Sequence, residues 1–193
     1  MIRTATERDA EKILEIYEYY IRNTAITFEC IVPTVEEFAE RIRKTLQKYP
    51  YLVSELDGEI IGYAYAGPLN TRQAFDWSVE CSIYVKPGLH KKGMGRELYT
   101  ALENALALQN IINLSACIAY PEKEDEYLNF NSVQFHSHFG YSMVGEFHRC
   151  GYKFDRWYGM VWMEKFIAPH DVPKPFRFFD EIREELWEKY QIR

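Results

Sequence analysis

The segment from residue 77 to residue 108 constrains the fold more strongly than any other part of the chain. Residues 77–85 carry the β-branched, aromatic and apolar side chains of a strand, and Pro87-Gly88 ends that strand. From Gly95 onward the apolar residues recur at helical spacing, namely Leu98, Ala101, Leu102, Ala105 and Leu106. A strand, a glycine-rich loop and a helix therefore follow one another, which predicts an α/β fold.

Helices and strands are also predicted on both sides of this segment. Residues 7–21 have the periodicity of an amphipathic helix, and Thr34 and Glu37 form a capping box at the start of a second helix. Asp57-Gly58 joins two β-rich runs, which predicts a hairpin over residues 51–66. The rest of the chain predicts, in order, a strand at 111–120, a helix at 129–139, strands at 141–151 and 157–166, and a helix at 179–190.

The length of the chain, 193 residues, falls in the size range of one domain. We expect an α/β domain over residues 1–167, with a mixed, mostly antiparallel sheet and helices on both faces. After Pro169 the chain is expected to leave the core, so residues 168–193 are predicted to form a C-terminal extension with a short helix.

Charge and composition argue against several kinds of partner. The net charge of −6 disfavours nucleic acid, because a phosphate backbone needs clustered Lys and Arg. No apolar run approaches the ~20 residues that span a bilayer, and the N-terminus lacks a signal-peptide core, so we expect a cytoplasmic protein without membrane contact. His136 and His138 lie on different helix faces with no third ligand, so no metal site is predicted.

The loop at the start of the 95–108 helix is a candidate anion site. Gly93 and Gly95 allow backbone amides to point toward a common ligand, and the helix adds its free amides and positive dipole end. The basic side chains around the loop are His90, Lys91, Lys92 and Arg96. These features predict a phosphorylated ligand, and a simple tight turn is the alternative.

Two familiar nucleotide motifs do not fit these residues. A Walker loop ends in Gly-Lys-Ser/Thr, but Gly95 is followed by Arg96-Glu97. A dinucleotide fingerprint needs a small residue where Leu98 stands, and it normally occupies the first βαβ unit. Kinase, ATPase and dinucleotide-dependent chemistry are therefore disfavoured.

The stretch Leu89-His90-Lys91-Lys92-Gly93-Met94-Gly95 resembles the acetyl-CoA motif of the GNAT acetyltransferase family, Q/R-x-x-G-x-G/A, with His90 at the position of Gln or Arg. Residues 129–141 are similar to the N-x-x-S-V-x-x-H-x-x-x-G-Y/F signature of the phosphinothricin acetyltransferase group within that family. Further segments match that group in order, at 63–68, 76–80, 84–85, 95–99 and 151–153. The resemblance extends from residue 1 to about residue 167.

The resemblance implies the GNAT fold, with acetyl-CoA as cosubstrate and no metal. In that fold the strand at 77–85 splays from the next strand, near residues 83–118, which leaves backbone groups for the pantetheine and for the thioester oxygen. The residues thereby implied to contact acetyl-CoA are Ile83, Tyr84, Val85, His90, Lys91, Lys92, Gly93, Met94, Gly95, Arg96, Asn129 and Ser132. For Asn129 and Ser132, helix N-capping is an equal alternative.

Glu80 and His136 are the predicted catalytic residues. A substrate ammonium with a pKa of about 10 must lose a proton before it can attack, so a base is needed. Glu80 lies between the apolar Val79 and Cys81, and the resemblance assigns it as that base; an exposed strand residue is the alternative. His136 has the position of a Tyr or His that faces the CoA sulfur in relatives, and structural packing is the alternative.

The resemblance also places Phe28, Tyr65 and Arg72 in the acceptor site. The planar guanidinium of Arg72 suits a substrate carboxylate, although surface and core roles remain alternatives for these three residues. Phe154 and Asn70 stand where the family has His and Lys, which puts phosphinothricin itself in question as the substrate.

We therefore expect an acetyl-CoA-dependent N-acetyltransferase that acts on a small amino-acid-like amine, of the phosphinothricin or methionine sulfoximine type, by direct transfer in a ternary complex. A catalytically silent acetyl-CoA-binding module and a protein N-terminal or lysine acetyltransferase are the alternatives. The acidic residues within 121–128 either select cationic substrates or form a solvated loop. The resemblance and the aromatic late strands imply a homodimer.

Overall fold

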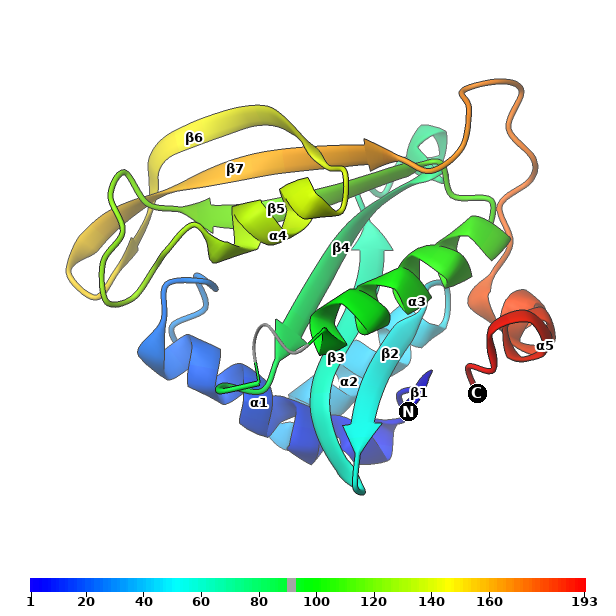
Figure 1. The fold of residues 1–193 in the computed structure, drawn as a ribbon, viewed down its shortest axis with the longest axis horizontal. Helices are drawn as coiled ribbons and strands as arrows, with labels where there is room; N and C mark the ends of the chain where they lie inside the picture. Colours follow the sequence, from blue (N-terminus) through cyan, green and yellow to red (C-terminus); the bar gives the residue numbers. More distant parts are fainter. Residues whose placement is uncertain (90–92) are drawn as a thin grey trace.

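One mixed sheet runs through the computed structural model, which describes residues 1–89 and 93–193 (Figure 1). The strands are β1 (Ile2–Thr4), β2 (Tyr51–Leu56), β3 (Glu59–Pro68), β4 (Ser78–Val85), β5 (Asn113–Tyr120), β6 (Ser142–Lys153) and β7 (Arg156–Phe166). Across the described residues they lie in the order β1-β2-β3-β4-β5-β7-β6. Neighbouring strands are antiparallel except β4 and β5, which are parallel.

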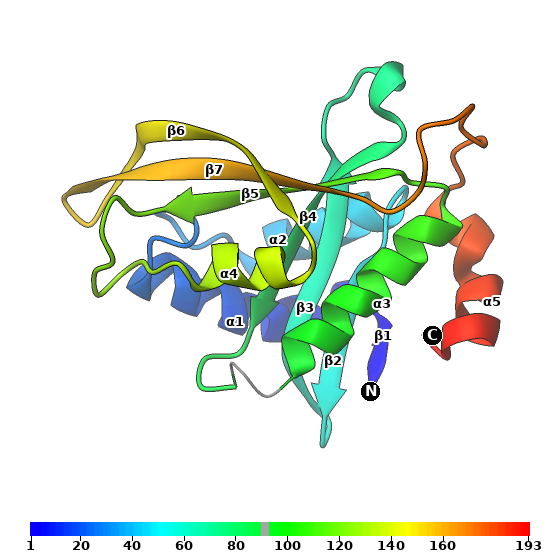
Figure 2. The ribbon, with the colours of Figure 1, turned by 45° about the horizontal axis from the view of Figure 1, so that its top comes forward.

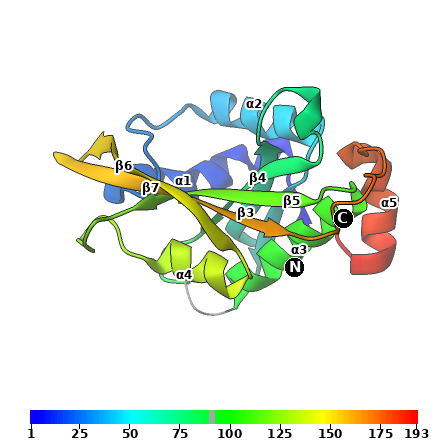
Figure 3. The ribbon, with the colours of Figure 1, turned by 90° about the horizontal axis from the view of Figure 1, so that it is seen from above.

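Helices cover both faces of this sheet (Figure 3). They are α1 (Ala10–Asn23), α2 (Val35–Leu46), α3 (Met94–Leu108), α4 (Asn131–His138) and α5 (Phe179–Tyr190), with short 3-10 turns η1 (Glu7–Asp9) and η2 (Gln73–Phe75). On one face, Ile13 of α1 and Ile42 of α2 share a core with Tyr63 of β3. On the other, Leu102 of α3 packs with Leu114 of β5. The predicted α/β class, with helices on both faces, is confirmed.

Two elements that short sequence motifs predicted are present in the structure. The Glu37 amide donates to the Thr34 hydroxyl over 3.1 Å and the Thr34 amide to the Glu37 carboxylate over 2.8 Å, so the capping box of α2 is present. Asp57 and Gly58 both have positive φ, at 51° and 81°, and they close the β2–β3 hairpin.

The central strands β4 and β5 touch only briefly and then part (Figure 2). Their parallel register consists of Ser78–Asn113, Val79–Leu114 and Glu80–Ser115. Beyond this contact β4 continues beside β3 as far as Val85, whereas β5 continues beside β7 as far as Tyr120. The predicted splay is confirmed, and it leaves one edge of β4 open after Glu80.

The C-terminal helix α5 packs onto the core instead of leaving it. Phe179 and Ile182 are fully buried in the same cluster as Leu102 of α3. The Thr4 amide also donates to the carbonyl of Arg193, which joins the two ends of the chain. The expectation that the chain leaves the core after Pro169 is therefore wrong for α5, because its apolar face covers α3. The division into residues 1–167 and 168–193 stays a prediction.

Replacement of Phe179 tests how strongly α5 supports the core. The Phe179 side chain is 0% exposed, so we expect Phe179→Ala to lower the free energy of unfolding by about 3–5 kcal/mol. The measurement is urea denaturation followed by circular dichroism. As a control on the same helix, the exposed Glu188→Ala should change it by less than about 0.5 kcal/mol. Equal stability of the two variants would show that α5 contributes nothing to the core.

Candidate functional site

The backbone amides of Ile83 and Val85 face the open edge of β4. The Lys86 N–H donates to the Ile61 carbonyl on β3 over 2.8 Å. Alternate residues of an antiparallel strand direct their backbone groups to opposite sides, so the amides of Val85 and Ile83 point away from β3. On that side β5 has already diverged. Two predicted cosubstrate contacts thus present donors along an edge that β5 does not pair.

Among residues 1–89 and 93–193, no side chain caps the N-terminus of α3. Gly93 precedes it with a φ of 85°, a left-handed conformation that glycine adopts without strain. The Gly93 carbonyl accepts hydrogen bonds from the amides of Arg96 and Glu97, at 2.9 and 3.1 Å. At α2, by contrast, the Thr34 side chain caps the terminus. The first amides of α3 and its positive dipole end are therefore available to an anionic ligand.

Gly95 brings this helix terminus against the end of β4. A methyl group on Gly95 would lie 3.6 Å from the Val85 side chain, 3.6 Å from Phe135 of α4 and 3.8 Å from Ile83. The first turn of α3, which also carries Met94 and Arg96, therefore meets β4 and α4 at one place. The predicted contacts that lie outside the described residues are His90, Lys91 and Lys92.

Glu80 lies where β4 and β5 part. It belongs to the last register pair of the two strands, opposite Ser115. Its side chain is half-buried, and burial raises the pKa of its carboxyl above the ordinary value. A carboxylate with a raised pKa accepts a proton more readily near neutral pH. The position and the environment of Glu80 fit the predicted general base.

Side chains of β4 alternate between the two faces of the sheet, so Tyr84 shares the face of Glu80. The Tyr84 ring lies against Tyr17 and Tyr20 of α1, with centroids 5.1 and 5.2 Å away. Its backbone groups point toward β3 by the same alternation that sends those of Val85 away. The structure does not bring Tyr84 to the open edge with Ile83 and Val85.

Tyr65 of β3 lies on the strand next to Glu80, and its role in the acceptor site stays a prediction. It lies opposite Ser82 in the β3–β4 register and stacks on Tyr51 with centroids 4.9 Å apart. Burial raises the pKa of the Tyr65 hydroxyl, a contact with Ser82 lowers it, and the Glu80 carboxylate raises it further. Because Ser82 and Glu80 alternate onto the same face of β4, Tyr65 shares that face with Glu80.

Phe28 lies in the segment between α1 and α2, which reaches across to β6. Its ring touches Gly151 so closely that a Cβ at Gly151 would overlap it. The buried Lys153 ammonium donates to the Thr27 carbonyl over 2.8 Å and fastens the same segment. This contact places Phe28 where the hairpin of β6 and β7 faces the α1 side of the sheet.

Arg72 occupies the exposed loop that leads into β4. Its amide donates to the Asn70 side chain over 3.1 Å, so Asn70 shapes this loop. Phe154 lies at the tip of the β6–β7 hairpin, where its φ of 50° is left-handed, and it stacks on Tyr127 at 4.2 Å. Asn70 and Phe154, the two residues that depart from the family pattern, thus both make contacts with neighbouring residues in this chain.

The acidic loop before α4 has most of its charge paired. Arg149 contacts Glu122 at 2.7 Å, and Arg156 contacts Asp125 at 2.9 Å and Glu126 at 2.8 Å. These ion pairs fasten the loop to the β6–β7 hairpin. Of the two roles considered from the sequence, selection of cationic substrates gains no support from such compensated carboxylates.

His136 of α4 is buried in a chain of hydrogen bonds. Its Nδ1 contacts the Ser132 carbonyl at 2.8 Å and its Nε2 the Tyr99 hydroxyl at 3.0 Å. Burial lowers the pKa of the imidazole, and because the carbonyl can only accept, Nδ1 carries the proton. Tyr99 then donates to Nε2, and Tyr141, 3.1 Å away, donates to Tyr99. Both ring nitrogens are occupied, and the role of His136 at the CoA sulfur stays a prediction.

Asn129 acts locally at the start of α4. Its side-chain oxygen accepts from the Asn131 amide over 3.0 Å, which explains why α4 begins at Asn131, later than predicted. The Ser132 carbonyl accepts the hydrogen bond from Nδ1 of His136. Sequence reasoning missed Tyr99 and Tyr141 as partners of His136; tyrosines within otherwise apolar patterns were the available signal.

Backbone donors along an open strand edge suit the amides of a pantetheine arm, and an uncapped helix terminus beside them suits its phosphates. Glu80 lies at the same branch of the sheet. The class that this fold and site define is a transferase that takes an acyl group from coenzyme A.

Comparison with known proteins narrows this class. The acetyltransferase (GNAT) domain family matches residues 2–162. The chain is 33% identical to phosphinothricin N-acetyltransferase of Streptomyces viridochromogenes over 182 residues, 94% of this chain and 95% of the relative. It is 31% identical to the L-methionine sulfoximine/L-methionine sulfone acetyltransferase of Salmonella typhimurium, over 89% and 97% of the two chains.

A phosphinothricin acetyltransferase from Sinorhizobium meliloti, solved in complex with acetyl-CoA, has a TM-score of 0.80 at 27% identity and covers 93% of this chain and 97% of its own. The chain belongs to the GNAT acetyltransferase family. Acetyl-CoA is its cosubstrate. No group that could hold a metal ion is found among the described residues.

Gly93 provides a test of the α3 terminus. Gly93→Ala forces alanine into a φ of 85°, so we expect acetyl-CoA affinity to fall about tenfold as the terminus shifts. Gly58→Ala is the matched control, because Gly58 has a φ of 81°, has equally open space around it and lies in the β2–β3 turn. Isothermal titration with acetyl-CoA is the measurement. Similar affinity in both variants would argue against cosubstrate binding at Gly93.

Proposed function

We propose that this acetyltransferase transfers the acetyl group to the amine of a small amino-acid-like substrate, by direct transfer in a ternary complex. The observation that carries the proposal is the place of Glu80, half-buried at the branch of the sheet, on the face opposite Ile83 and Val85. Relatives named for phosphinothricin and for methionine sulfoximine support an amino-acid-like acceptor.

The chain's own residues divide the chemistry between one face of β4, which carries Glu80, and the open edge of the same strand. Glu80 takes a proton from the substrate ammonium, directly or through water, and the neutral amine then attacks the thioester carbonyl. One backbone amide near Val85 donates a hydrogen bond to the carbonyl oxygen as negative charge develops on it. An N–C bond forms and the C–S bond breaks. The leaving thiolate takes the second proton of the attacking nitrogen, so the products are the amide and the thiol of coenzyme A, and Glu80 releases its proton to solvent. Phe28, Tyr65 and Arg72 bind the acceptor in this proposal.

A panel of amines tests the proposal through thiol release from acetyl-CoA. The panel contains phosphinothricin, methionine sulfoximine, common amino acids, and peptides with free N-termini or lysines. Turnover of small amino acids alone supports the proposal. Turnover of peptides alone identifies a protein acetyltransferase, and tight acetyl-CoA binding without turnover of any amine identifies a silent binding module.

Replacement of Glu80 tests the general base. We expect Glu80→Gln to lower kcat/KM about 10²–10⁴-fold, because the amide cannot accept the proton. The base works only when ionised, so wild-type activity should fall as pH falls through its raised pKa, above the ~4.3 of an exposed glutamate. Measurement of kcat/KM against pH should show this acid limb in the wild type and lose it in Glu80→Gln. Acetyl-CoA affinity serves as the control and should not change, whereas an unchanged kcat/KM would remove Glu80 from the mechanism.

We also propose that the protein is a cytoplasmic homodimer. Support for the dimer comes from β6, an edge strand whose apolar side chains are exposed together with Trp157 of β7. The exposed large hydrophobic side chains on β6 are Met143, Val144, Phe147 and Tyr152. Within the described residues, no helix is long and apolar enough to cross a bilayer.

A charge introduced among the exposed apolar side chains of β6 tests the dimer. Phe147 is 57% exposed, and we expect Phe147→Lys to weaken the dimer at least about tenfold, because a charge would be buried at the interface. Val172→Lys, at a residue 95% exposed in the C-terminal segment, is the control. Analytical ultracentrifugation gives the mass. A wild-type monomer at high protein concentration would refute the dimer.

A further inference from the structure

Residues 24–34, between α1 and α2, join the two arms of the split sheet (Figures 1 and 3). One arm consists of β1, β2, β3 and β4, and the other of β5, β7 and β6. Helix α1 packs against β3 of the first arm. The segment after α1 reaches the second arm, where Ala25 is buried with Ala119 of β5 and Tyr158 of β7. We call residues 24–34 the bridge segment.

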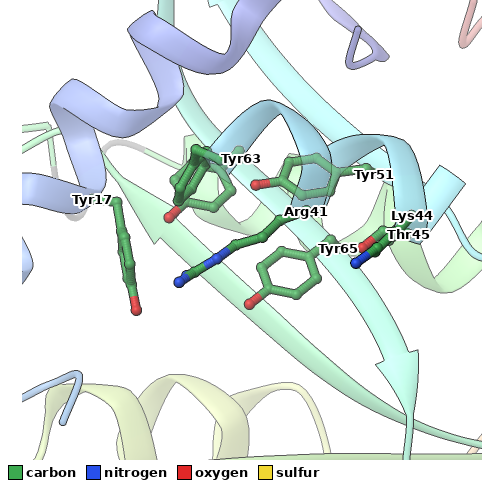
Figure 4. A pocket seen from close by; sticks show the side chains of 8 residues that line it. Tyr17, Arg41, Lys44, Thr45, Tyr51, Tyr63 and Tyr65 are labelled. Carbon is green, nitrogen blue, oxygen red and sulfur yellow. The ribbon is translucent and has the colours of Figure 1, made fainter. Parts of the chain in front are cut away.

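Two polar contacts hold the bridge segment on the side of the first arm. The Thr27 hydroxyl lies 2.9 Å from the Tyr17 hydroxyl of α1, and the Glu29 carboxylate pairs with Arg41 of α2 at 2.8 Å. Tyr17 and Arg41 also line a cavity of about 300 Å³ between α2 and the sheet, together with the predicted acceptor residue Tyr65 (Figure 4). The bridge segment therefore lies beside the predicted acceptor site.

A buried lysine holds the bridge segment on the side of the second arm. Lys153 of β6 is 6% exposed, and its ammonium donates to the Thr27 carbonyl over 2.8 Å. Two residues before it, Gly151 leaves the space that the Phe28 ring fills, because a Cβ at Gly151 would overlap the ring. Thr27 is thus fixed between α1 and β6, and Phe28 follows it directly in the chain.

The contact between the bridge segment and β6 lies on the face of the sheet that carries Glu80. Glu80 pairs with Ser115 of β5, whose partner on β7 is Glu164. Residues an even number of positions apart on a strand share a face, so Tyr158 of β7 has the face of Glu164. Gly151 is the partner of Tyr158 on β6, and paired residues share a face. The bridge segment therefore covers the acceptor side of the sheet.

A lysine is a costly residue at this buried position. Among residues 1–89 and 93–193, the Lys153 ammonium makes one hydrogen bond and no ion pair. Burial lowers the pKa of Lys153 below its ordinary value, so the surroundings disfavour the charge. An apolar side chain would fill the same space at a lower cost in free energy. The ammonium is therefore explained by its hydrogen bond to Thr27 and not by packing.

We propose that Lys153 is a positioning residue for the acceptor: its hydrogen bond to the Thr27 carbonyl holds the bridge segment against β6 and thereby holds Phe28 in the wall of the acceptor site. The inference rests on the proposed function and adds to it a residue that acts through its neighbours. Glu80 and the open edge of β4 do not depend on this tether. Loss of the tether weakens binding of the acceptor and leaves binding of acetyl-CoA intact.

Replacement of Lys153 by methionine tests the tether. Methionine keeps an unbranched side chain and removes the ammonium, and a buried apolar side chain is tolerated, so Lys153→Met is expected to fold. The acceptor is L-methionine sulfoximine or else the amine of the panel with the highest kcat/KM. We expect its KM to rise about tenfold, because one charge-assisted hydrogen bond is lost. The kcat and the KM for acetyl-CoA should change by less than about twofold.

Lys165→Met is the matched control. Lys165 is a part-buried lysine on the same arm, but it pairs with Glu103 of α3 at 2.7 Å, on the other face of the sheet. This variant should leave the KM for the acceptor unchanged.

Gly151→Ala is a second test that leaves Lys153 in place. The new Cβ displaces the Phe28 ring, so the KM for the acceptor should rise in this variant too. Because both changes displace the same segment, the double variant should show less than the product of the two single effects. A full product would contradict a shared action through the bridge segment.

Hydrogen exchange of the bridge segment separates failure of this inference from failure of the proposed function. The Ala25 amide donates to the Tyr127 carbonyl over 3.0 Å, so exchange in the bridge segment reports on its contact with the second arm. We expect exchange there to be at least about tenfold faster in Lys153→Met and unchanged in Lys165→Met. If the wild type acetylates no amine of the panel, the proposed function fails, and the exchange rates alone decide on the tether. Unchanged exchange in Lys153→Met, or an unchanged KM for the acceptor in an active enzyme, would overturn the proposal.

Discussion

The short parallel contact between β4 and β5 is the constraint on which the rest of the structure depends. The Trp77 carbonyl accepts hydrogen bonds from the amides of Ile112 and Asn113, each 3.0 Å long. The pairing of β4 with β5 then ends at Glu80. Each strand keeps its longer antiparallel partner, β3 for β4 and β7 for β5. Divergence exposes backbone donors in the middle of a sheet, where a ligand can replace the missing strand.

Successive side chains of β4 point to opposite faces of the sheet, so this strand can bind the cosubstrate and the acceptor in different places. Ile83 and Val85 meet the first turn of α3 on one face, while Glu80 lies on the other face with Tyr84 and the tyrosines below α1 and α2. Cosubstrate and acceptor therefore approach the same strand from different sides. At this position burial raises the pKa of the Glu80 carboxyl above its ordinary value.

Local signals predicted the elements well because their causes are local. Asp57-Gly58 formed the expected hairpin, and Thr34 and Glu37 formed the expected capping box. The partners of His136 could not be predicted in this way, because Tyr99 and Tyr141 come from distant parts of the chain. The packing of α5 was likewise missed, since helical periodicity shows that a helix has an apolar face but not which surface that face covers.

The sequence by itself determined the order of elements, the glycine-led start of α3 and the family, because periodicity, turn chemistry and motif spacing are properties of neighbouring residues. Tertiary structure alone decided that the expected splay of β4 begins directly after Glu80, that His136 lies in the core, and that Tyr51 and Tyr63 share a cavity with Arg41. These features depend on strand register and helix packing, which bring together residues far apart in the chain.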